Sequence, residues 1–332
     1  MILTRTPLRV SFFGGGSDHP EHFIRHGGAV LGMAIDKYVY IGVKRMPPGQ
    51  LHNGTPLRYR VQYSKVDDCQ SVDEIRHPAV RAALLYLKID EPLEFHIFGD
   101  LPGRSGLGGS SAFSVGCLHA LLRLRHPKVE LAPLDLAREA IAFEKFFLRE
   151  AVGCQDQLFA ALGGALHVQF GSAESIINQI EILDPRLAEL EASLVLVYSG
   201  TMRDAAPLAA RQAKAAPSNA RALGALRDLA AEGAAVLRGD DSLDQIGELL
   251  NNAWYHKRGL CSDITSPAID AFYSRGMWLG ATGGKLLGAG GGGFMLFFVP
   301  QAKRDTFEAG IGAPCVRFNL ASQGSTVIID ES

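Results

Sequence analysis

Residues 101–112 read LPGRSGLGGSSA, a glycine-rich loop that ends in hydroxyl side chains and runs directly into an apolar segment with helical spacing. Glycines let backbone N–H groups turn toward an anion, and a helix N-terminus adds partial positive charge there. A hydroxyl at the end of such a loop can reach the metal ion that accompanies a nucleotide. We therefore predict an ATP phosphate site made of Gly103, Arg104, Ser105, Gly106, Leu107, Gly108, Gly109, Ser110 and Ser111.

The better-known phosphate loops do not match this chain. A Walker A loop needs G-x-x-x-x-G-K followed by Ser or Thr, and Gly284-Lys285 is followed by leucine. A formal G-x-G-x-x-G occurs at Gly288, Gly290 and Gly293, but it leads into the apolar run 294–299. That run is typical of a strand, whereas the dinucleotide fingerprint opens a helix. We therefore interpret this match as a false positive.

Composition narrows the class of protein. A chain of 332 residues with 47% hydrophobic content can form two packed lobes. A net charge of −2 without a long basic run argues against nucleic-acid binding. We expect a soluble, cytoplasmic protein that does not bind membranes, because no apolar stretch has membrane-spanning length and the five cysteines form no C-x-x-C pair.

The pattern of residues predicts an α+β fold with strands and helices in clusters. Expected strands cover residues 3–13, 30–45, 57–63, 93–98, 165–170, 193–198, 293–299, 315–319 and 325–329. Expected helices cover 77–87, 110–125, 134–151, most of 203–257, 267–274 and a segment after Pro300. We place a domain boundary between 170 and 195, which divides the chain into 1–185 and 186–332.

A second glycine cluster, at residues 14–16, is followed by Ser17-Asp18-His19. An exposed aspartate beside a glycine turn suits sugar hydroxyls, because a carboxylate can accept two hydrogen bonds. The alternative for Asp18 is a helix N-cap for the segment from Pro20. Arg9 ends the first expected strand close to this turn, and its alternative is a surface charge.

Two further carboxylates lie after the glycine-rich loop. Glu144 stands in an apolar stretch, either facing solvent or partly buried as a metal ligand, and Asp156 follows Gly153 at the start of another apolar helix, where it could cap the helix. Phosphoryl transfer needs ligands for Mg²⁺ and a group that orients or deprotonates the attacking hydroxyl. Beside a nucleotide loop, we expect Ser110 and Glu144 to hold Mg²⁺ and Asp156 to act on the hydroxyl.

Three ordered motifs resemble those of the GHMP kinases, the superfamily of galactokinase, homoserine kinase and mevalonate kinase. The motifs are TPLRV with GGGSD at residues 6–18, GLGGSSA at 106–112 and KLLGAGGGG at 285–293. The resemblance implies an N-terminal lobe like ribosomal protein S5 domain 2 and a ferredoxin-like C-terminal lobe, with ATP and Mg²⁺ bound between them.

The same resemblance assigns roles to individual residues. It makes Arg9 and Asp156 the catalytic pair and Ser110 and Glu144 the Mg²⁺ ligands. It supports substrate contacts from Gly15, Gly16, Ser17, Asp18, Gly290 and Gly291, to which we add Lys257 and Arg258 as candidates for a second anion site. Arg203 and Lys285 are further candidates, and for each of these basic side chains a solvated surface charge is the alternative.

Within the superfamily, the chain most resembles D-glycero-D-manno-heptose 7-phosphate kinases, through HPAV at 77–80, DLPGRSGLG at 100–108 and GCQDQ at 153–157. The implied reaction phosphorylates the anomeric hydroxyl to give the 1,7-bisphosphate for nucleotide-activated heptose and capsule or lipopolysaccharide synthesis. The expected partners are therefore ATP and a sugar phosphate, with a homo-oligomer allowed. The alternatives are a kinase for a free sugar of the fucose or galactose type, a non-catalytic sensor of sugar and ATP, and a structural protein.

Overall fold

The computed structural model describes residues 1–47, 49–52, 54–201 and 205–331 of the chain. Its centre is an antiparallel pair of long strands, β1 (Ile2–Phe13) and β2 (Gly28–Arg45). Their register shifts between Pro7 and Leu8, where β2 carries two extra residues. Such a bulge bends a sheet, so the two halves of β2 pair with different neighbours. Arg9 therefore lies immediately after the bend.

Over the described ranges, the first sheet has eight strands. Its main path runs in the order β14 (Thr326–Asp330), β1, β2, β7 (Leu93–Gly99), β5 (Tyr59–Gln62) and β6 (Val66–Cys69). The other half of β2 pairs with β8 (Ala165–Phe170), which pairs with β9 (Ser175–Gln179). A separate small hairpin joins β3 (Leu51–His52) and β4 (Thr55–Pro56).

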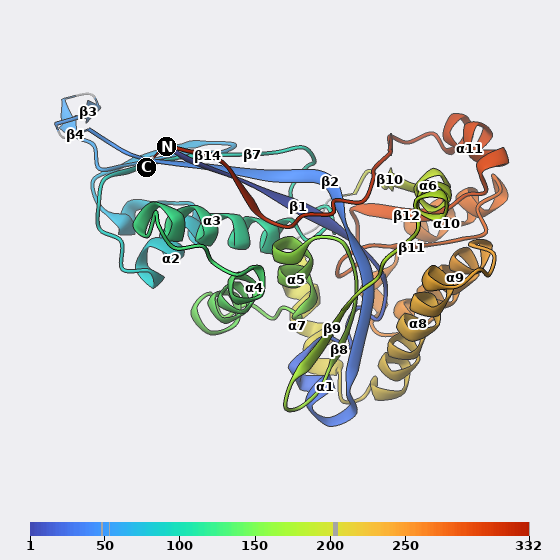
Figure 1. Ribbon diagram of the computed structural model, residues 1–332. Coiled ribbons are helices and arrows are strands. Elements are labelled where there is room, and N and C mark those ends of the chain that lie inside the picture. Colours follow the sequence, from blue (N-terminus) through green and yellow to red (C-terminus); the bar gives the residue numbers. More distant parts are fainter. Residues whose placement is uncertain (48, 53, 202–204, 332) are drawn as a thin grey trace.

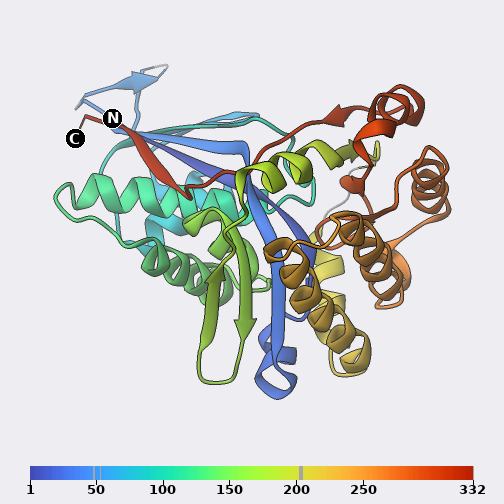
Figure 2. The same cartoon turned by 45° about the vertical axis from the view of Figure 1, so that its right-hand side comes forward.

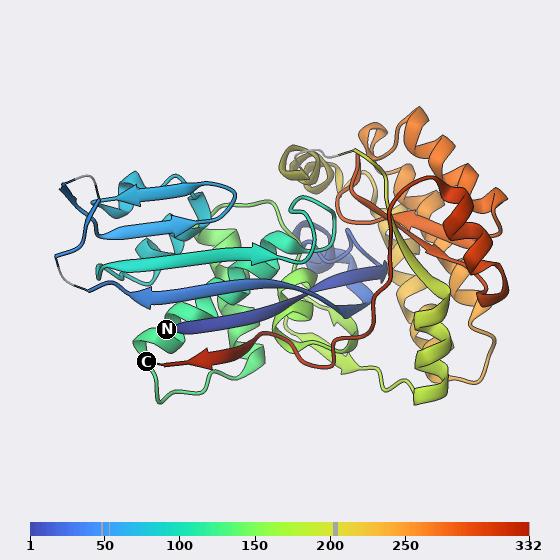
Figure 3. The ribbon, with the colours of Figure 1, turned by 90° about the horizontal axis from the view of Figure 1, so that it is seen from above.

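Helices cover one face of this sheet, and Figure 3 shows the strands from the other side (Figures 1 and 3). They are α2 (Pro78–Tyr86), α3 (Gly109–Arg125), α4 (Pro133–Ala142) with a π-helical turn (Phe143–Phe147), and α5 (Gln155–Leu162). The short helix α1 (Pro20–His26) lies near the start of β2, and a 3₁₀ turn (Val72–Glu74) precedes α2.

A second, four-stranded sheet has the order β11 (Gly283–Leu286), β12 (Phe294–Phe298), β10 (Leu194–Tyr198) and β13 (Cys315–Val316). Around it lie α6 (Asp184–Ser193), α9 (Asp244–Arg258), α10 (Pro267–Trp278) and α11 (Arg304–Ile311) (Figure 2). Helix α8 (Ala220–Arg238) packs against α9 and against β2 of the first sheet. Helix α7 (Ala205–Ala215) and two 3₁₀ turns (Ser262–Ile264 and Gln301–Lys303) complete this half.

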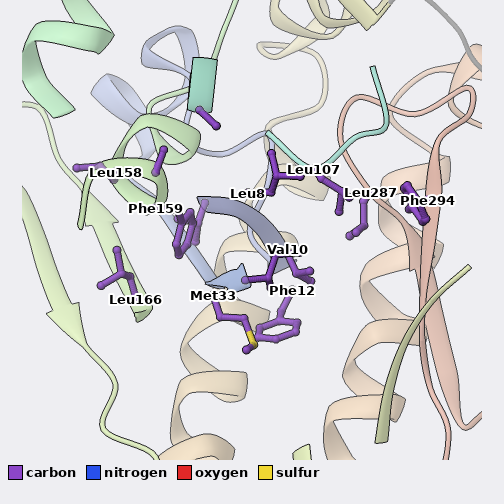
Figure 4. Packing of buried hydrophobic residues seen from close by; sticks show 14 of the residues in the cluster. Leu8, Val10, Phe12, Met33, Leu107, Leu158, Phe159, Leu166, Leu287 and Phe294 are labelled. Atoms are coloured by element: carbon purple, nitrogen blue, oxygen red, sulfur yellow. The ribbon is translucent and has the colours of Figure 1, made fainter. Parts of the chain in front are cut away.

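The two halves share a continuous apolar core. Figure 4 shows Leu8 of β1, Leu107 of the glycine-rich loop and Leu287 of the third glycine motif close together. All three side chains are at most 3% exposed. Their burial packs segments that are far apart in the sequence against one another, which places the three glycine motifs at one point between the sheets.

The predicted α+β organisation is confirmed, and the long expected strands and helices occur close to their expected bounds. The structure differs at residues 283–286, which lie outside the expected strands and which form the buried strand β11. The division at residue 185 stays a prediction, although β14 from the end of the chain belongs to the first sheet. Within the described ranges, no helix combines the length and apolar character that crossing a membrane requires.

Candidate active site

An arginine–aspartate pair joins β1 to the start of α5. Arg9 donates from Nε to Asp156 Oδ1 at 2.8 Å and from Nη2 to Asp156 Oδ2 at 2.7 Å. The side chain of Arg9 is 6% exposed and that of Asp156 25% exposed. This two-point geometry fixes the plane of the carboxylate and leaves part of it open to a small molecule. The alternatives of a surface charge for Arg9 and a helix cap for Asp156 are both wrong.

Arg9 also holds the glycine-rich loop. Its Nη1 donates to Gly106 O at 2.6 Å, and its backbone N–H donates to Leu107 O at 3.0 Å. Gly108 is the N-cap of α3 in a left-handed conformation, and a Cβ there would lie 3.1 Å from Arg9 Cγ and 3.3 Å from Asp156 Oδ2. The loop can therefore approach the ion pair only because residue 108 has no side chain.

The N-terminus of α3 is open toward an anion. The first amide of its hydrogen-bond ladder is that of Ala112, which donates to Gly108 O at 2.9 Å. The amides of residues 109–111 precede this ladder, so they have no acceptor within the helix. Together with the helix dipole, they fit the phosphate site predicted for residues 103–111. Gly103 and Arg104 at the start of the loop are exposed.

The third glycine motif packs backbone to backbone against this loop. A Cβ on Gly288 would lie 2.6 Å from Gly106 Cα, and one on Gly293 would lie 2.4 Å from Ser105 O. Phe294 N–H donates to Ser105 O at 3.0 Å and begins β12. The G-x-G-x-x-G match thus leads into a strand, as we inferred from the sequence, and its glycines permit the contact between the two loops.

Glu144 is fully buried behind the start of α3. Its Oε2 accepts from Ser111 Oγ at 3.0 Å and from Gln157 Nε2 at 2.5 Å. Its Oε1 is buried without a hydrogen-bond partner among the described residues. Desolvation raises the pKa of Glu144 to about 7, against hydrogen bonds that lower it. A buried carboxylate oxygen with no partner, beside serine hydroxyls, is a donor set that fits Mg²⁺.

The metal prediction is only partly reflected in these contacts. Ser110 is exposed on the first turn of α3, and its neighbour Ser111 makes the contact with Glu144. In the described part of the chain, no cluster of three or more His, Cys, Asp or Glu side chains could hold a metal ion alone. Mg²⁺ commonly takes one or two carboxylates plus phosphate oxygens, so a site at Glu144 needs the nucleotide as well.

The prediction for Asp18 is wrong in its exposure. Its side chain is 1% exposed, and Gly16 N–H donates to Oδ1 at 2.8 Å while Gln155 N–H donates to Oδ2 at 3.3 Å. These backbone donors occupy the oxygens that we assigned to a sugar. The helix-cap alternative is also wrong, because the N-cap of α1 is His19. Asp18 instead connects the first glycine turn to the residue that precedes Asp156.

The other residues of the first motif divide into two groups. Ser17 is fully buried, with Oγ 2.8 Å from Gly14 O and 3.0 Å from Ala29 O, so its predicted substrate contact is corrected to a structural one. Gly15 and Gly16 are half-buried, and Gly16 lines a small hollow with His19 and Gln212. The substrate contacts of Gly15 and Gly16 stay a prediction.

The structure also corrects the second anion site. Lys257 is 8% exposed, and its Nζ donates to Leu286 O at 2.8 Å and to Gly288 O at 2.5 Å, so it holds a loop rather than facing a ligand. Arg258 is exposed at the end of α9 and pairs with Asp270 at 3.0 Å.

Two more predicted contacts are corrected in the third motif. Gly291 N–H donates to Ile264 O at 2.9 Å, and Gly290 is buried against Ile264, so neither glycine presents a free edge to a substrate. Lys285 is 4% exposed and bonded to backbone. Arg203 lies outside the described residues.

Sequence reasoning missed the supporting roles of Ser11, Gln155 and Gln157, and it assigned Ser111 to ATP and not to the support of Glu144. Ser11 Oγ donates to Gln155 Oε1 at 2.8 Å, which ties β1 to α5 beside the ion pair. Gln157 and Ser111 hold Glu144 from two helices. The signal in the sequence was the polar run Gln155-Asp156-Gln157 at the head of an otherwise apolar helix, because three consecutive side chains point to three different neighbours.

This arrangement places the chain in a class of small-molecule kinases. Sequence profiles of that class match it twice, the GHMP kinases N-terminal domain over residues 77–164 and the GHMP kinases C-terminal domain over 234–316. The chain belongs to the GHMP kinase family, as its motifs predicted. Members of this family use ATP as phosphate donor, generally with Mg²⁺.

Individual relatives are similar to this chain over most of its length, and their names give different sugars as acceptors. The D-glycero-alpha-D-manno-heptose 7-phosphate kinase of Campylobacter jejuni is 28% identical over 314 residues, covering 91% of each chain. The galactokinase of Pyrococcus furiosus is 26% identical, covering 96% of this chain and 94% of its own. A solved D-glycero-D-manno-heptose 1-phosphate kinase from Bacteroides thetaiotaomicron superposes with a TM-score of 0.79 over the whole of both chains at 21% identity, which shows the shared fold.

Proposed function

We propose that this chain phosphorylates the anomeric hydroxyl of D-glycero-D-manno-heptose 7-phosphate with ATP, giving the 1,7-bisphosphate. The observation that best supports kinase activity is the bidentate ion pair of Arg9 and Asp156. This pair is held against the glycine loop at the N-terminus of α3. The choice of sugar is supported by the relative from Campylobacter jejuni, whose similarity covers 91% of both chains. The product suits the synthesis of nucleotide-activated heptose in the cytoplasm for capsule or lipopolysaccharide.

In this proposal Asp156 accepts a hydrogen bond from the attacking hydroxyl and orients or deprotonates it. Arg9 keeps the carboxylate in position through two N–H donors and places positive charge where negative charge develops. Its third contact, to Gly106 O at 2.6 Å, ties the orientation of the carboxylate to the phosphate loop. The amides of residues 109–111 receive the phosphates at the N-terminus of α3.

Glu144 and Ser110 are the proposed Mg²⁺ ligands, with Ser111 and Gln157 holding the carboxylate. When bound, Mg²⁺ neutralises charge on the β- and γ-phosphates. The free Oε1 of Glu144 is the ligand atom that the structure leaves without another partner in its described part. Because burial raises the pKa of Glu144 to about 7, a nearby cation would favour the ionised carboxylate that a ligand must be.

The second candidate is a kinase for an unphosphorylated sugar, and one observation favours it. Both lysines that could have met a sugar phosphate are buried and bonded to backbone carbonyls, which leaves Arg258, paired with Asp270, as the described candidate for that contact. The relative from Pyrococcus furiosus is a galactokinase. A non-catalytic sensor is less well supported, since Asp156, Glu144 and Ser110 all retain the required side chains.

The deciding experiment measures ADP release with Mg·ATP against heptose 7-phosphate, sedoheptulose 7-phosphate, mannose, fucose, galactose and mevalonate, with Asp156→Ala as control. We expect turnover of heptose 7-phosphate alone and its loss in the variant. Turnover of a free sugar would overturn the substrate and keep the kinase. Arg258→Ala tests the second anion site, and an unchanged KM for heptose 7-phosphate would remove Arg258 from it.

A further inference from the structure

Two lysines of the second half of the chain are buried beside the candidate active site. Lys257 lies on α9 and Lys285 on β11, and their side chains are 8% and 4% exposed. Neither makes an ion pair within 4 Å in the described residues. Each uses its Nζ to hold two backbone carbonyls, which is an unusual placement for side chains that are otherwise mostly exposed.

Lys285 reaches across to β1. Its Nζ donates to Ser11 O at 3.0 Å and to Phe12 O at 2.7 Å. Ser11 follows Arg9 by two positions on the same strand, and its Oγ donates to Gln155, the neighbour of Asp156. A single side chain of the second sheet therefore fixes the backbone that presents both members of the ion pair.

Lys257 holds the third glycine motif in place. Its contacts with Leu286 O and Gly288 O fix the turn that packs against Gly106, where a Cβ on Gly288 would meet Gly106 Cα at 2.6 Å. Gly106 O is in turn the acceptor of Arg9 Nη1. Both lysines are thus connected to Arg9 through other residues. Lys257 is connected through the two glycine loops, and Lys285 is connected through the backbone of β1.

The chemistry of an amine suits this role. Burial lowers the pKa of Lys257 to about 7, with Arg9 as a smaller cause, and burial lowers the pKa of Lys285 well below its usual value, with Lys257 and Arg9 as smaller causes. A neutral amine keeps two N–H donors, enough for two carbonyls. It therefore provides the hydrogen bonds without the large desolvation penalty of a buried charge.

We propose that Lys257 and Lys285 are positioning residues for phosphoryl transfer, which hold the glycine loop and β1 so that Arg9 and Asp156 stay aligned with the phosphate site. They act through backbone carbonyls and touch neither substrate. This inference rests on the proposed kinase activity but not on the identity of the sugar. Their effect belongs to the reaction step, because a small misalignment of reacting groups lowers the rate more than it lowers binding.

The test compares Lys257→Met and Lys285→Met with Arg304→Met. Arg304 is the control, since it is 8% exposed and donates to the backbone carbonyls of Glu191 and Ala192 away from the site; it also pairs with Glu308 at 2.9 Å. We expect all three variants to lower Tm. We expect both lysine variants to lower kcat by roughly 10- to 100-fold with KM for ATP and sugar within about threefold of wild type, and Arg304→Met to leave kcat within about twofold.

Lys257→Gln separates hydrogen bonding from packing. Glutamine keeps N–H donors without a charge, so a higher kcat with glutamine than with methionine supports positioning, and recovery of kcat by methionine contradicts it. If Lys285→Met fails to fold, Lys285→Gln retains an amide donor and is expected to show a smaller loss of kcat. A lysine variant that is folded and has wild-type kcat would overturn the proposal.

A readout without substrate keeps this inference separate from the choice of function. Amide hydrogen exchange reports on Arg9 N–H and Phe294 N–H, which donate to Leu107 O and Ser105 O in the joined loops. We expect Lys257→Met to speed exchange at both amides by tenfold or more, and Arg304→Met to leave them unchanged. Unchanged exchange in the lysine variant would overturn the positioning role even if no acceptor sugar is turned over.

Discussion

Arg9 carries more of the candidate site than any other described side chain, because its three nitrogen donors and its backbone amide all bind within it. The pair with Asp156 is bidentate, through Nε and Nη2. The third nitrogen, Nη1, donates to Gly106 O of the glycine-rich loop. Lysine has a single nitrogen at its end and cannot reproduce this fork.

We therefore expect Arg9→Lys to lower kcat by roughly 10²-fold, measured as ADP release with the best acceptor. Circular dichroism should show an unchanged fold. As a control, Arg60→Lys removes an equally two-pointed pair, with Asp68, that lies on β5 and β6. If kcat of Arg9→Lys were within twofold of the wild-type value, the bidentate ion pair would not be needed for phosphoryl transfer.

Two adjacent serines make the metal prediction testable at single residues. Ser110 is exposed and free to reach a cation bound to nucleotide, whereas Ser111 is buried and donates to Glu144. We expect Ser110→Ala to raise the Mg²⁺ concentration needed for half-maximal rate by tenfold or more, since a direct ligand is lost. Ser111→Ala should raise it less, because only the support of a ligand is lost. The opposite order in a Mg²⁺ titration of the initial rate would make Ser111 the ligand.

Among the elements, the second and third glycine loops pack backbone to backbone at the site. Gly106 has φ +82°, and a Cβ there would lie 2.7 Å from Leu287 O. Gly106→Ala is expected to lower the free energy of unfolding by about 2 kcal/mol or more, because it combines a left-handed backbone with a steric overlap. It should also raise KM for ATP, since the loop must move.

Gly103→Ala is the matched control for this loop. No atom of the described residues lies within 4 Å of a Cβ at that position, so we expect a change within about 0.5 kcal/mol. Urea unfolding of both variants checks the difference. Equal stability of Gly106→Ala and wild type would contradict the close packing of the two loops.

At the scale of the whole molecule, the end of the chain returns to its beginning. β14 pairs with β1, Arg123 pairs with Asp330 at 2.6 Å, and Ser325 Oγ lies 2.8 Å from Thr6 Oγ1 and 3.0 Å from His119 Nδ1. These contacts cover one edge of the first sheet close to both described termini (Figure 1).

A chain that stops at residue 324 is therefore expected to lose about 2 kcal/mol of stability or more, on the order of 5 °C in Tm. The reason is the loss of the ladder and of the polar contacts that join β1, α3 and the C-terminal segment. Ile328→Thr is the control, because that side chain is 45% exposed on the same strand and should change Tm little. Thermal unfolding checks the expectation. Equal Tm values for the truncated chain and Ile328→Thr would contradict a stabilising role for the C-terminal strand.

Most secondary structure could be predicted because its causes are local. β-branched and aromatic residues predicted β1 and β2, a short alternating run predicted β7, and helix start and stop signals predicted the helix expected at 134–151, which begins as α4. The strand β11 was missed because its two glycines have no local preference for a strand. They are needed where the strand passes α9 and β12, since a Cβ on Gly283 would lie 1.7 Å from Gly247 O.

The sequence alone determined the family, most of the long strands and helices, and the three glycine motifs that meet at the site, because these follow from short patterns of residue type. Only the tertiary structure decided which polar side chains serve ligands and which serve the backbone. Asp18 and Lys257 look like substrate contacts in the sequence, yet buried amides and carbonyls from distant segments occupy them. A polar side chain binds whatever donors or acceptors surround it after burial, and folding brings these partners together from residues far apart in the chain.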